Sequence, residues 1–184
     1  MSAEQPRPGE GEGAPDGSGE TGVRHVVEEC TRRGLTLAAC ESLTAGLVSA
    51  RIADVPGASA VLRGGLVTYA TDLKESLAGV DPDRLEQTGP VDGEVARQMA
   101  EGARRACGAD LAVATTGVAG PDPVGEQEAG TVWIAVTGLA PRRLSLPGDR
   151  AAVRAGAAEA AIALVAEALR QLPAGTGGSD LDVS

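Results

Sequence analysis

Two residues of this sequence could act together as a nucleophile and its base. Lys74 is the only lysine among the 16 lysine and arginine residues, so the chain uses arginine wherever else it needs a cation. Arginine does not release its proton in proteins, whereas a lysine desolvated in a pocket can become a neutral base. The alternative is that Lys74 is an ordinary surface cation on a short helix.

Ser42 is the candidate nucleophile. It lies in the stretch "LAACESLTAGLVSARI", between an apolar run typical of a buried strand and a run typical of a helix. Most serines at such a place only cap the helix, but a serine within reach of a lysine can attack a carbonyl while helix N–H groups stabilise the oxyanion. The single His25 gives no Ser-His-Asp triad, so serine chemistry here would use lysine.

The elements that must position these residues alternate between strands and helices. This order predicts an α/β fold, a three-layer α/β/α sandwich with a mostly parallel or mixed central sheet. The apolar periodicity predicts strands within residues 35–40, 58–70, 109–117, 131–138 and 142–148. It predicts helices over residues 23–34, 44–53, 71–79, 81–89, 91–108 and 149–172, with Thr71 or Asp72, Asp92 and Asp149 as caps.

Three polar segments follow predicted strands and could converge on one site. They are "ESLTAG", "TYATDLK" and "TTGVAGPDP". In an open α/β sheet the ligand crevice lies at the carboxyl ends of the strands, so we expect these segments to meet there. Thr116, Gly117 and Gly120 could bring backbone N–H groups close to an anion, the alternative being a plain connecting loop. Arg150 and Arg154, four residues apart, form either a solvated basic edge or a phosphate clamp.

Composition limits the classes of partner. With 184 residues and 42% hydrophobic content, the chain suits one domain, over residues 21–172, between disordered tails at 1–20 and 173–184. A net charge of −10 argues against binding to nucleic acid or to an anionic membrane. The cysteines lack metal-site or disulfide spacing, and no apolar run approaches the length of about 18 residues that a membrane span needs. We therefore expect a cytoplasmic protein.

Several ordered motifs resemble one family. The series "ESLTAG", "GGLVTYATDLKESLAGV", "GPVDGEVARQMAEGAR", "TTGVAGPDP", "GTVWIAV" and "GDRAAVR" is similar to the CinA C-terminal domain family, over about residues 22–172. Active members of that family are nicotinamide mononucleotide (NMN) deamidases. The resemblance implies an amidohydrolase of pyridine nucleotide salvage that forms nicotinic acid mononucleotide and ammonia, without a metal or other cofactor, and that is a homo-oligomer.

The resemblance also assigns site residues. It implies catalytic roles for Ser42, Lys74, Tyr69 and Thr44, and contacts to a small-molecule nucleotide substrate for Glu41, Gly46, Thr116, Gly117, Gly120 and Arg150. The sequence departs from the family pattern at Leu43, where cysteine is usual, at Ala45, where glycine is usual, and at Asp92, where serine is usual. Asp92 remains a good helix cap, whereas Ala45 could tighten the pocket. The rival hypothesis is a non-catalytic module that binds a nucleotide or a protein through the same crevice, and a third is hydrolysis of another small amide.

Overall fold

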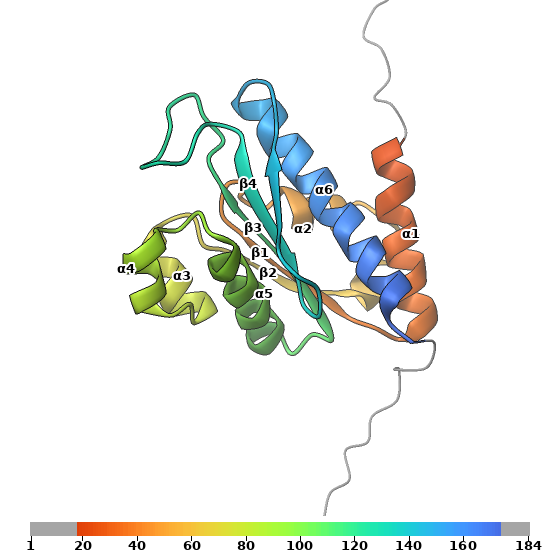
Figure 1. The fold of residues 1–184 in the computed structure, drawn as a ribbon. Coiled ribbons are helices and arrows are strands. Elements are labelled where there is room, and N and C mark those ends of the chain that lie inside the picture. Colours follow the sequence, from red (N-terminus) through yellow and green to blue (C-terminus); the bar gives the residue numbers. More distant parts are fainter. Residues whose placement is uncertain (1–17, 174–184) are drawn as a thin grey trace, which may run out of the picture.

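The sheet is mixed and lies between two layers of helices (Figure 1). The computed structural model describes residues 18–173. The strand order is β2-β1-β3-β4-β5, in which β1 (Leu37–Glu41) is parallel to both β2 (Leu62–Val67) and β3 (Leu111–Gly117). The last two strands, β4 (Thr131–Val136) and β5 (Arg142–Ser145), are antiparallel. The predicted α/β/α sandwich with a mixed sheet is confirmed.

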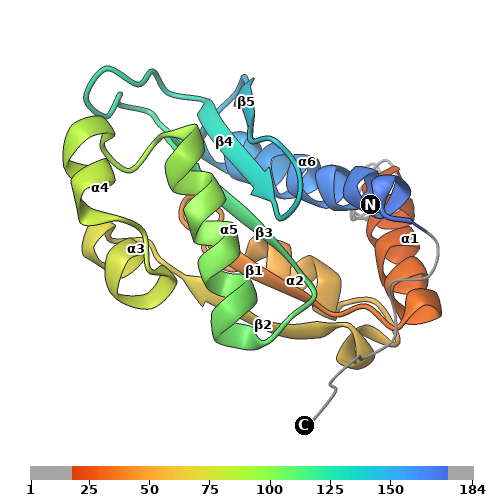
Figure 2. The same cartoon turned by 60° about the horizontal axis from the view of Figure 1, so that its bottom comes forward.

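Two sets of helices cover the two faces of the sheet (Figure 2). One face carries α1 (Ser18–Arg33), α2 (Leu47–Ala53) and the long α6 (Arg150–Gln171). The other face carries α5 (Gly93–Cys107), with α3 (Thr71–Ala78) and α4 (Pro82–Thr88) beside it. A short 3₁₀ turn, η1 (Ala58–Ala60), precedes β2.

The two cores differ in the size of their side chains. Along β1, Leu37 and Ala39 pack into the larger core under α1, α2 and α6, while Ala38 and Cys40 face the alanine-rich core under α5. Small residues let α5 and α3 approach closely. At Gly102 of α5, an added Cβ would overlap the backbone of Ala78 on α3. This close packing holds α3, which carries Lys74, beside the sheet.

Several chain segments meet at one edge of the sheet, namely the edge at which the parallel strands end. The carboxyl ends of the three parallel strands lie there, and β4 begins there because Gly117 pairs with Val132. Since β5 returns to the same edge at Ser145, α6 also starts there. The segments that we expected to converge therefore do so.

Helix starts differ from the sequence prediction at two places. We predicted a helix over residues 44–53, but α2 begins at Leu47, because Ala45 and Gly46 have left-handed backbone angles, φ 50° and 99°. At α3 the cap position is Ala70, which makes no side-chain cap hydrogen bond, so the predicted cap at Thr71 or Asp72 is wrong.

Two other caps follow the prediction, and β2 shows a register shift at its glycine pair. Asp92 and Asp149 cap α5 and α6 through their carboxylates. The register of β2 against β1 shifts next to Gly64 and Gly65, as expected for a glycine pair.

The predicted N-terminal tail is too long by one helical turn. Ser18–Glu20 belong to α1, because the helix extends beyond its buried stripe of Val23, Val26 and Val27. Residues 1–17 and 174–184, which make up the rest of the predicted tails, lie outside the described residues. Among the helices that the structure describes, none has the length and apolar character needed to cross a membrane.

Candidate active site

A cleft of about 500 Å³ opens at the carboxyl edge of the parallel strands. Its lining comes from the turn after β1, the β2–α3 connection and α3 itself, the segment before α5, the end of β3 with the loop after it, and the first residue of α6. These lining residues are Ser42, Leu43, Tyr69, Thr71, Lys74, Pro90, Val91, Thr116, Gly117, Val118, Ala119, Gly120, Pro121, Asp122, Pro123, Val124 and Arg150. A cleft of this size fits a mononucleotide.

Ser42 and Lys74 meet at the floor of this cleft. The Lys74 Nζ atom lies 3.1 Å from Ser42 Oγ and donates a second hydrogen bond, of 2.8 Å, to the Thr68 carbonyl. Lys74 is only 1% exposed and Ser42 only 8%. Because Ser42 is four residues before the cap position of α2, it does not cap that helix. The structure thus favours the paired interpretation of both residues over the ordinary ones.

Burial makes Lys74 easier to deprotonate. Removal from water lowers the pKa of Lys74 below its usual value of 10.5, while nearby Cys40 and Asp72 oppose this effect more weakly. Within residues 18–173 no carboxylate forms an ion pair with Lys74. A neutral Lys74 amine can accept the Ser42 hydroxyl proton, reversing the direction of their hydrogen bond.

Glu41 and Gly46 do not line the cleft, contrary to the predicted substrate contacts. The Glu41 side chain is 1% exposed and accepts hydrogen bonds from the N–H groups of Gly46, Val48 and Ser49 and from the Ser49 hydroxyl, at 2.7–3.0 Å. Glu41 therefore caps α2 from the preceding strand. The first N–H groups of α2, which we expected to stabilise an oxyanion, are occupied by this carboxylate.

Backbone N–H groups in the turn between β1 and α2 are the donors that Glu41 does not bind. The backbone N–H groups of Leu43 and Thr44 have no hydrogen-bond partner within the described part of the chain. Thr44 is fully buried, and a buried N–H without a partner is rare in proteins. The Thr44 hydroxyl bonds to Thr115 Oγ1 at 2.7 Å and does not line the cleft, so its predicted catalytic role is not supported for the side chain.

Tyr69 and Arg150 form the outer wall. The Arg150 guanidinium donates to the Tyr69 hydroxyl at 2.6 Å and to the Gly120 carbonyl at 2.9 Å. Both side chains line the cleft, as do Thr116 and Gly117. Thr116 donates its hydroxyl proton to the Pro90 carbonyl at 2.6 Å, which ties the end of β3 to the segment before α5.

Arg154 and Ala45 do not reach the cleft. Arg154 donates instead to the carbonyls of Leu43 and Thr44, so it forms neither a solvated edge nor a phosphate clamp with Arg150. Ala45 is exposed and does not line the cleft, so it does not tighten the pocket. Its left-handed backbone explains why glycine would suit this position.

Sequence reasoning missed Pro90 and Val91 as lining residues. A signal was present, because they directly precede the Asp92 cap of a helix that starts at the ligand edge. In the described residues, no group of three or more His, Cys, Asp or Glu side chains is arranged to hold a metal ion.

The fold and cleft define an α/β/α protein with a buried serine–lysine pair at the carboxyl edge of its parallel strands. The family model of the CinA C-terminal domain matches residues 20–169, and the chain belongs to this family.

Relatives and solved structures agree with this assignment. A CinA-like protein of Frankia casuarinae is 44% identical over 151 residues, which cover 80% of this chain and 35% of the relative. A CinA-like protein of Geobacter sulfurreducens is 44% identical over 143 residues, which cover 76% of this chain and 34% of the relative. The chain therefore spans about a third of the length of these relatives.

Among solved structures, the competence/damage inducible protein CihA of Agrobacterium tumefaciens superposes with a TM-score of 0.81 at 31% identity, covering 87% of this chain and all of its own. A CinA superfamily protein of Klebsiella pneumoniae gives a TM-score of 0.80 at 29% identity, covering 84% of this chain and 99% of its own. These names state no chemical reaction.

Proposed function

We propose that the chain is an amidohydrolase that converts NMN to nicotinic acid mononucleotide and ammonia through a Ser42–Lys74 pair. The observation that carries this proposal is the hydrogen bond between Lys74 Nζ and Ser42 Oγ, in a site where burial lowers the pKa of the lysine. The resemblance to NMN deamidases supplies the substrate. A cleft of nucleotide size, lined by both apolar and polar residues, supports it.

The reaction balances with the groups present. Neutral Lys74 takes the Ser42 hydroxyl proton as Oγ attacks the carboxamide carbon, and Lys74 then gives that proton to the leaving nitrogen. The C–N bond breaks, ammonia leaves and an acyl ester remains on Ser42. Water then attacks the ester while Lys74 accepts its proton, and Lys74 returns that proton to Ser42 Oγ as the ester C–O bond breaks. The acid product leaves as the carboxylate after losing its own proton to solvent.

The oxyanion needs donors close to Ser42 Oγ. We assign this role to the backbone N–H groups of Leu43 and Thr44, because the α2 donors are occupied by Glu41. One well-placed oxyanion donor is typically worth about 3 kcal/mol in the transition state.

Arg150 is the candidate phosphate ligand. Its guanidinium lines the cleft at the start of α6, and within residues 18–173 it donates to a carbonyl and a phenol rather than to a carboxylate. A phosphate could replace those neutral acceptors, or share the guanidinium with them, with a gain in charge complementarity. In a protein of net charge −10, such a local cation is needed to attract an anionic substrate.

The test is ammonia release by purified protein from NMN, from its dephosphorylated nucleoside and from a panel of other nucleotide amides. We expect release from NMN that Ser42→Ala abolishes. Arg150→Ala should raise KM for NMN far more than for the nucleoside, whereas Arg142→Ala, which breaks an exposed ion pair with Glu167, should change neither. Release from another amide only would replace NMN as the substrate, and no release from any amide would favour the binding module.

A further inference from the structure

Arg154 lies one helical turn after Arg150 but has different surroundings. It is half-buried, and it donates from Nε to the Leu43 carbonyl and from Nη2 to the Thr44 carbonyl, both at 2.9 Å. Within the described residues it forms no ion pair with a carboxylate. Because the half-buried Arg154 guanidinium binds these two backbone carbonyls and no carboxylate, it holds the turn after Ser42.

These contacts determine how the peptide groups of that turn are oriented. The carbonyl and the N–H of one peptide group point in opposite directions, because the group is planar and trans. Holding the Leu43 carbonyl toward α6 therefore turns the Thr44 N–H away from α6. Holding the Thr44 carbonyl likewise fixes the Ala45 N–H, which donates to the Ser42 carbonyl at 3.1 Å and closes the turn.

We infer that Arg154 is a positioning residue that orients and polarises the Thr44 N–H, one of the two oxyanion donors proposed beside Ser42. A guanidinium that donates to a carbonyl oxygen makes the N–H of the same peptide group a stronger donor, since hydrogen bonds in a chain polarise one another. This inference rests on the proposed serine chemistry, but it does not depend on NMN as the substrate.

The other anchors of the turn cannot replace Arg154. Glu41 holds Gly46 and the first residues of α2, and the Thr44 hydroxyl is held by Thr115. Neither contact reaches the Leu43 carbonyl. The Thr44 carbonyl also accepts a hydrogen bond from the Leu47 N–H, at 3.2 Å, so it is the Leu43 carbonyl that depends on Arg154. Ala45 occupies a left-handed conformation that a non-glycine residue adopts only when its surroundings impose it. Removing the guanidinium should therefore let the middle of the turn relax.

The test uses a fluorophosphonate, which reports on the serine without NMN. In this reaction the Ser42 Oγ–P bond forms, the P–F bond breaks, fluoride leaves and Lys74 takes the serine proton. We expect Arg154→Ala to slow labelling of Ser42 by about 10- to 100-fold, the size of effect that a small misplacement of catalytic groups causes. The matched control Arg142→Ala should label at the wild-type rate, and added guanidinium should restore part of the rate to Arg154→Ala.

Steady-state kinetics separate this role from ligand binding. Arg154→Ala should lower kcat equally for NMN and its nucleoside and leave KM for both unchanged, because Arg154 does not line the cleft. Arg154→Lys keeps the charge but cannot bind both carbonyls in the same way, so its labelling rate should lie between those of wild type and Arg154→Ala. This second variant also provides a test if Arg154→Ala unfolds.

The outcomes are distinct. Labelling of Arg154→Ala or Arg154→Lys at the wild-type rate overturns the inference, and so does a KM increase for NMN that the nucleoside does not show. Wild-type protein that labels at Ser42 but releases no ammonia from NMN overturns the proposed substrate, while the labelling comparison still decides the role of Arg154. A wild-type Ser42 that does not label overturns both.

Discussion

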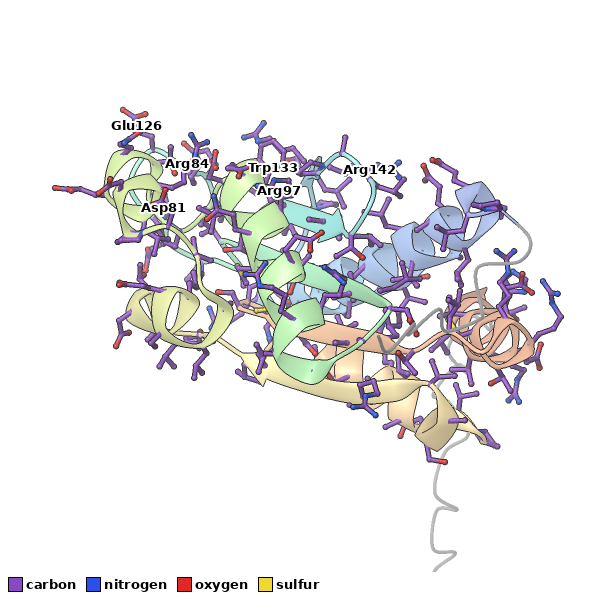
Figure 3. The ribbon with its side chains drawn as sticks, turned by 90° about the horizontal axis from the view of Figure 1, so that it is seen from below. Asp81, Arg84, Arg97, Glu126, Trp133 and Arg142 are labelled. Atoms are coloured by element: carbon purple, nitrogen blue, oxygen red, sulfur yellow. The ribbon has the colours of Figure 1, made fainter. Side chains whose placement is uncertain are left out.

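The first N–H groups of α2 and of α5 both need acceptors, but residues at different positions supply those acceptors. At α5, Asp92 sits at the cap position and accepts hydrogen bonds from the next N–H groups, with Arg84 of α4 (labelled in Figure 3) pairing to the same carboxylate oxygen at 2.7 Å. At α2, the cap position is Gly46 and the acceptor is Glu41, which belongs to the preceding strand. The usual rule, that the side chain at the cap position accepts these hydrogen bonds, holds at α5 but not at α2.

Capping by Glu41 leaves the side chains of the turn before α2 without a capping role. Because Glu41 caps α2 from five residues upstream of the cap position, no side chain of residues 42–45 is needed to cap the helix. They form a turn with a left-handed Ala45, a serine beside a buried lysine and N–H groups at Leu43 and Thr44 that have no partner in the described chain. Departures from local rules of this kind are expected to concentrate at functional sites.

The largest loss of activity is expected when the residue at position 74 cannot release its proton. We predict that Lys74→Arg lowers kcat about as much as Lys74→Ala, by about 10²- to 10⁴-fold, because guanidinium stays protonated and cannot act as a base. Ser42→Ala should cost a similar factor, and the double variant little more, since a nucleophile and its base act as a unit. Near-normal turnover in Lys74→Arg would remove the pair from the mechanism.

Asp92→Ala is the matched control for the α5 start. It should leave kcat unchanged and destabilise the fold by about 1 kcal/mol, the usual cost of a lost cap. Ser42→Ala should do the reverse, with loss of rate and a melting temperature close to that of the wild type.

A change at Glu41 should affect both stability and rate. Glu41→Gln replaces one acceptor oxygen by an NH₂ group that faces N–H donors, so we expect a loss of about 1–3 kcal/mol in the free energy of unfolding. Urea unfolding measures this loss. Glu126→Gln is the control, because Glu126 is exposed on the loop after β3 (labelled in Figure 3). Equal stability of the two variants would show that the α2 start does not depend on Glu41.

The single lysine makes its protonation directly measurable. In protein labelled with ¹³C-lysine only Lys74 contributes a lysine signal, and its titration midpoint should lie below 10.5. Because the base must be neutral, kcat/KM should rise with pH until that midpoint is passed. A midpoint at or above 10.5 would contradict the role of Lys74 as a base.

Stability should follow the same titration. Between the folded-state midpoint and the unfolded value near 10.5, the unfolded chain binds more protons than the folded one. The stability of wild type relative to Lys74→Met should therefore increase as pH rises through this window. A difference that stays flat with pH would show that burial does not shift the lysine.

The smallest expected effect concerns the backbone of the turn. Ala45→Gly relieves a left-handed alanine at φ 50°, so we predict a gain of about 0.5–1 kcal/mol in stability. Ala50→Gly, at an exposed right-handed position inside α2, should instead lose about 1 kcal/mol. Calorimetry of the two variants checks the sign, and a shift of both in the same direction would contradict the assigned strain.

Local pattern determined much of this protein. Hydrophobic periodicity was enough for the order of strands and helices, and Asp92 and Asp149 were recognisable as caps, because both signals depend on residues within one or two turns of each other. Composition alone singled out Lys74. The direction of parallel strands then predicted that Ser42, Lys74 and the loop after β3 would share one edge.

Only the tertiary structure decided which polar residues face the cleft. Glu41, Thr44 and Gly46 stand in the same short motif as Ser42, yet they hold the turn rather than line the cleft. Arg150 and Arg154 share one face of α6, yet the first lines the cleft and the second binds the carbonyls of Leu43 and Thr44. The Thr44 hydroxyl is held by Thr115 on a different strand, and the role of Arg154 depends on contacts with a segment more than a hundred residues away, as in its hydrogen bond to Thr44. Such contacts are fixed by how α6 packs across the sheet, and the periodicity of one helix carries no information about that packing.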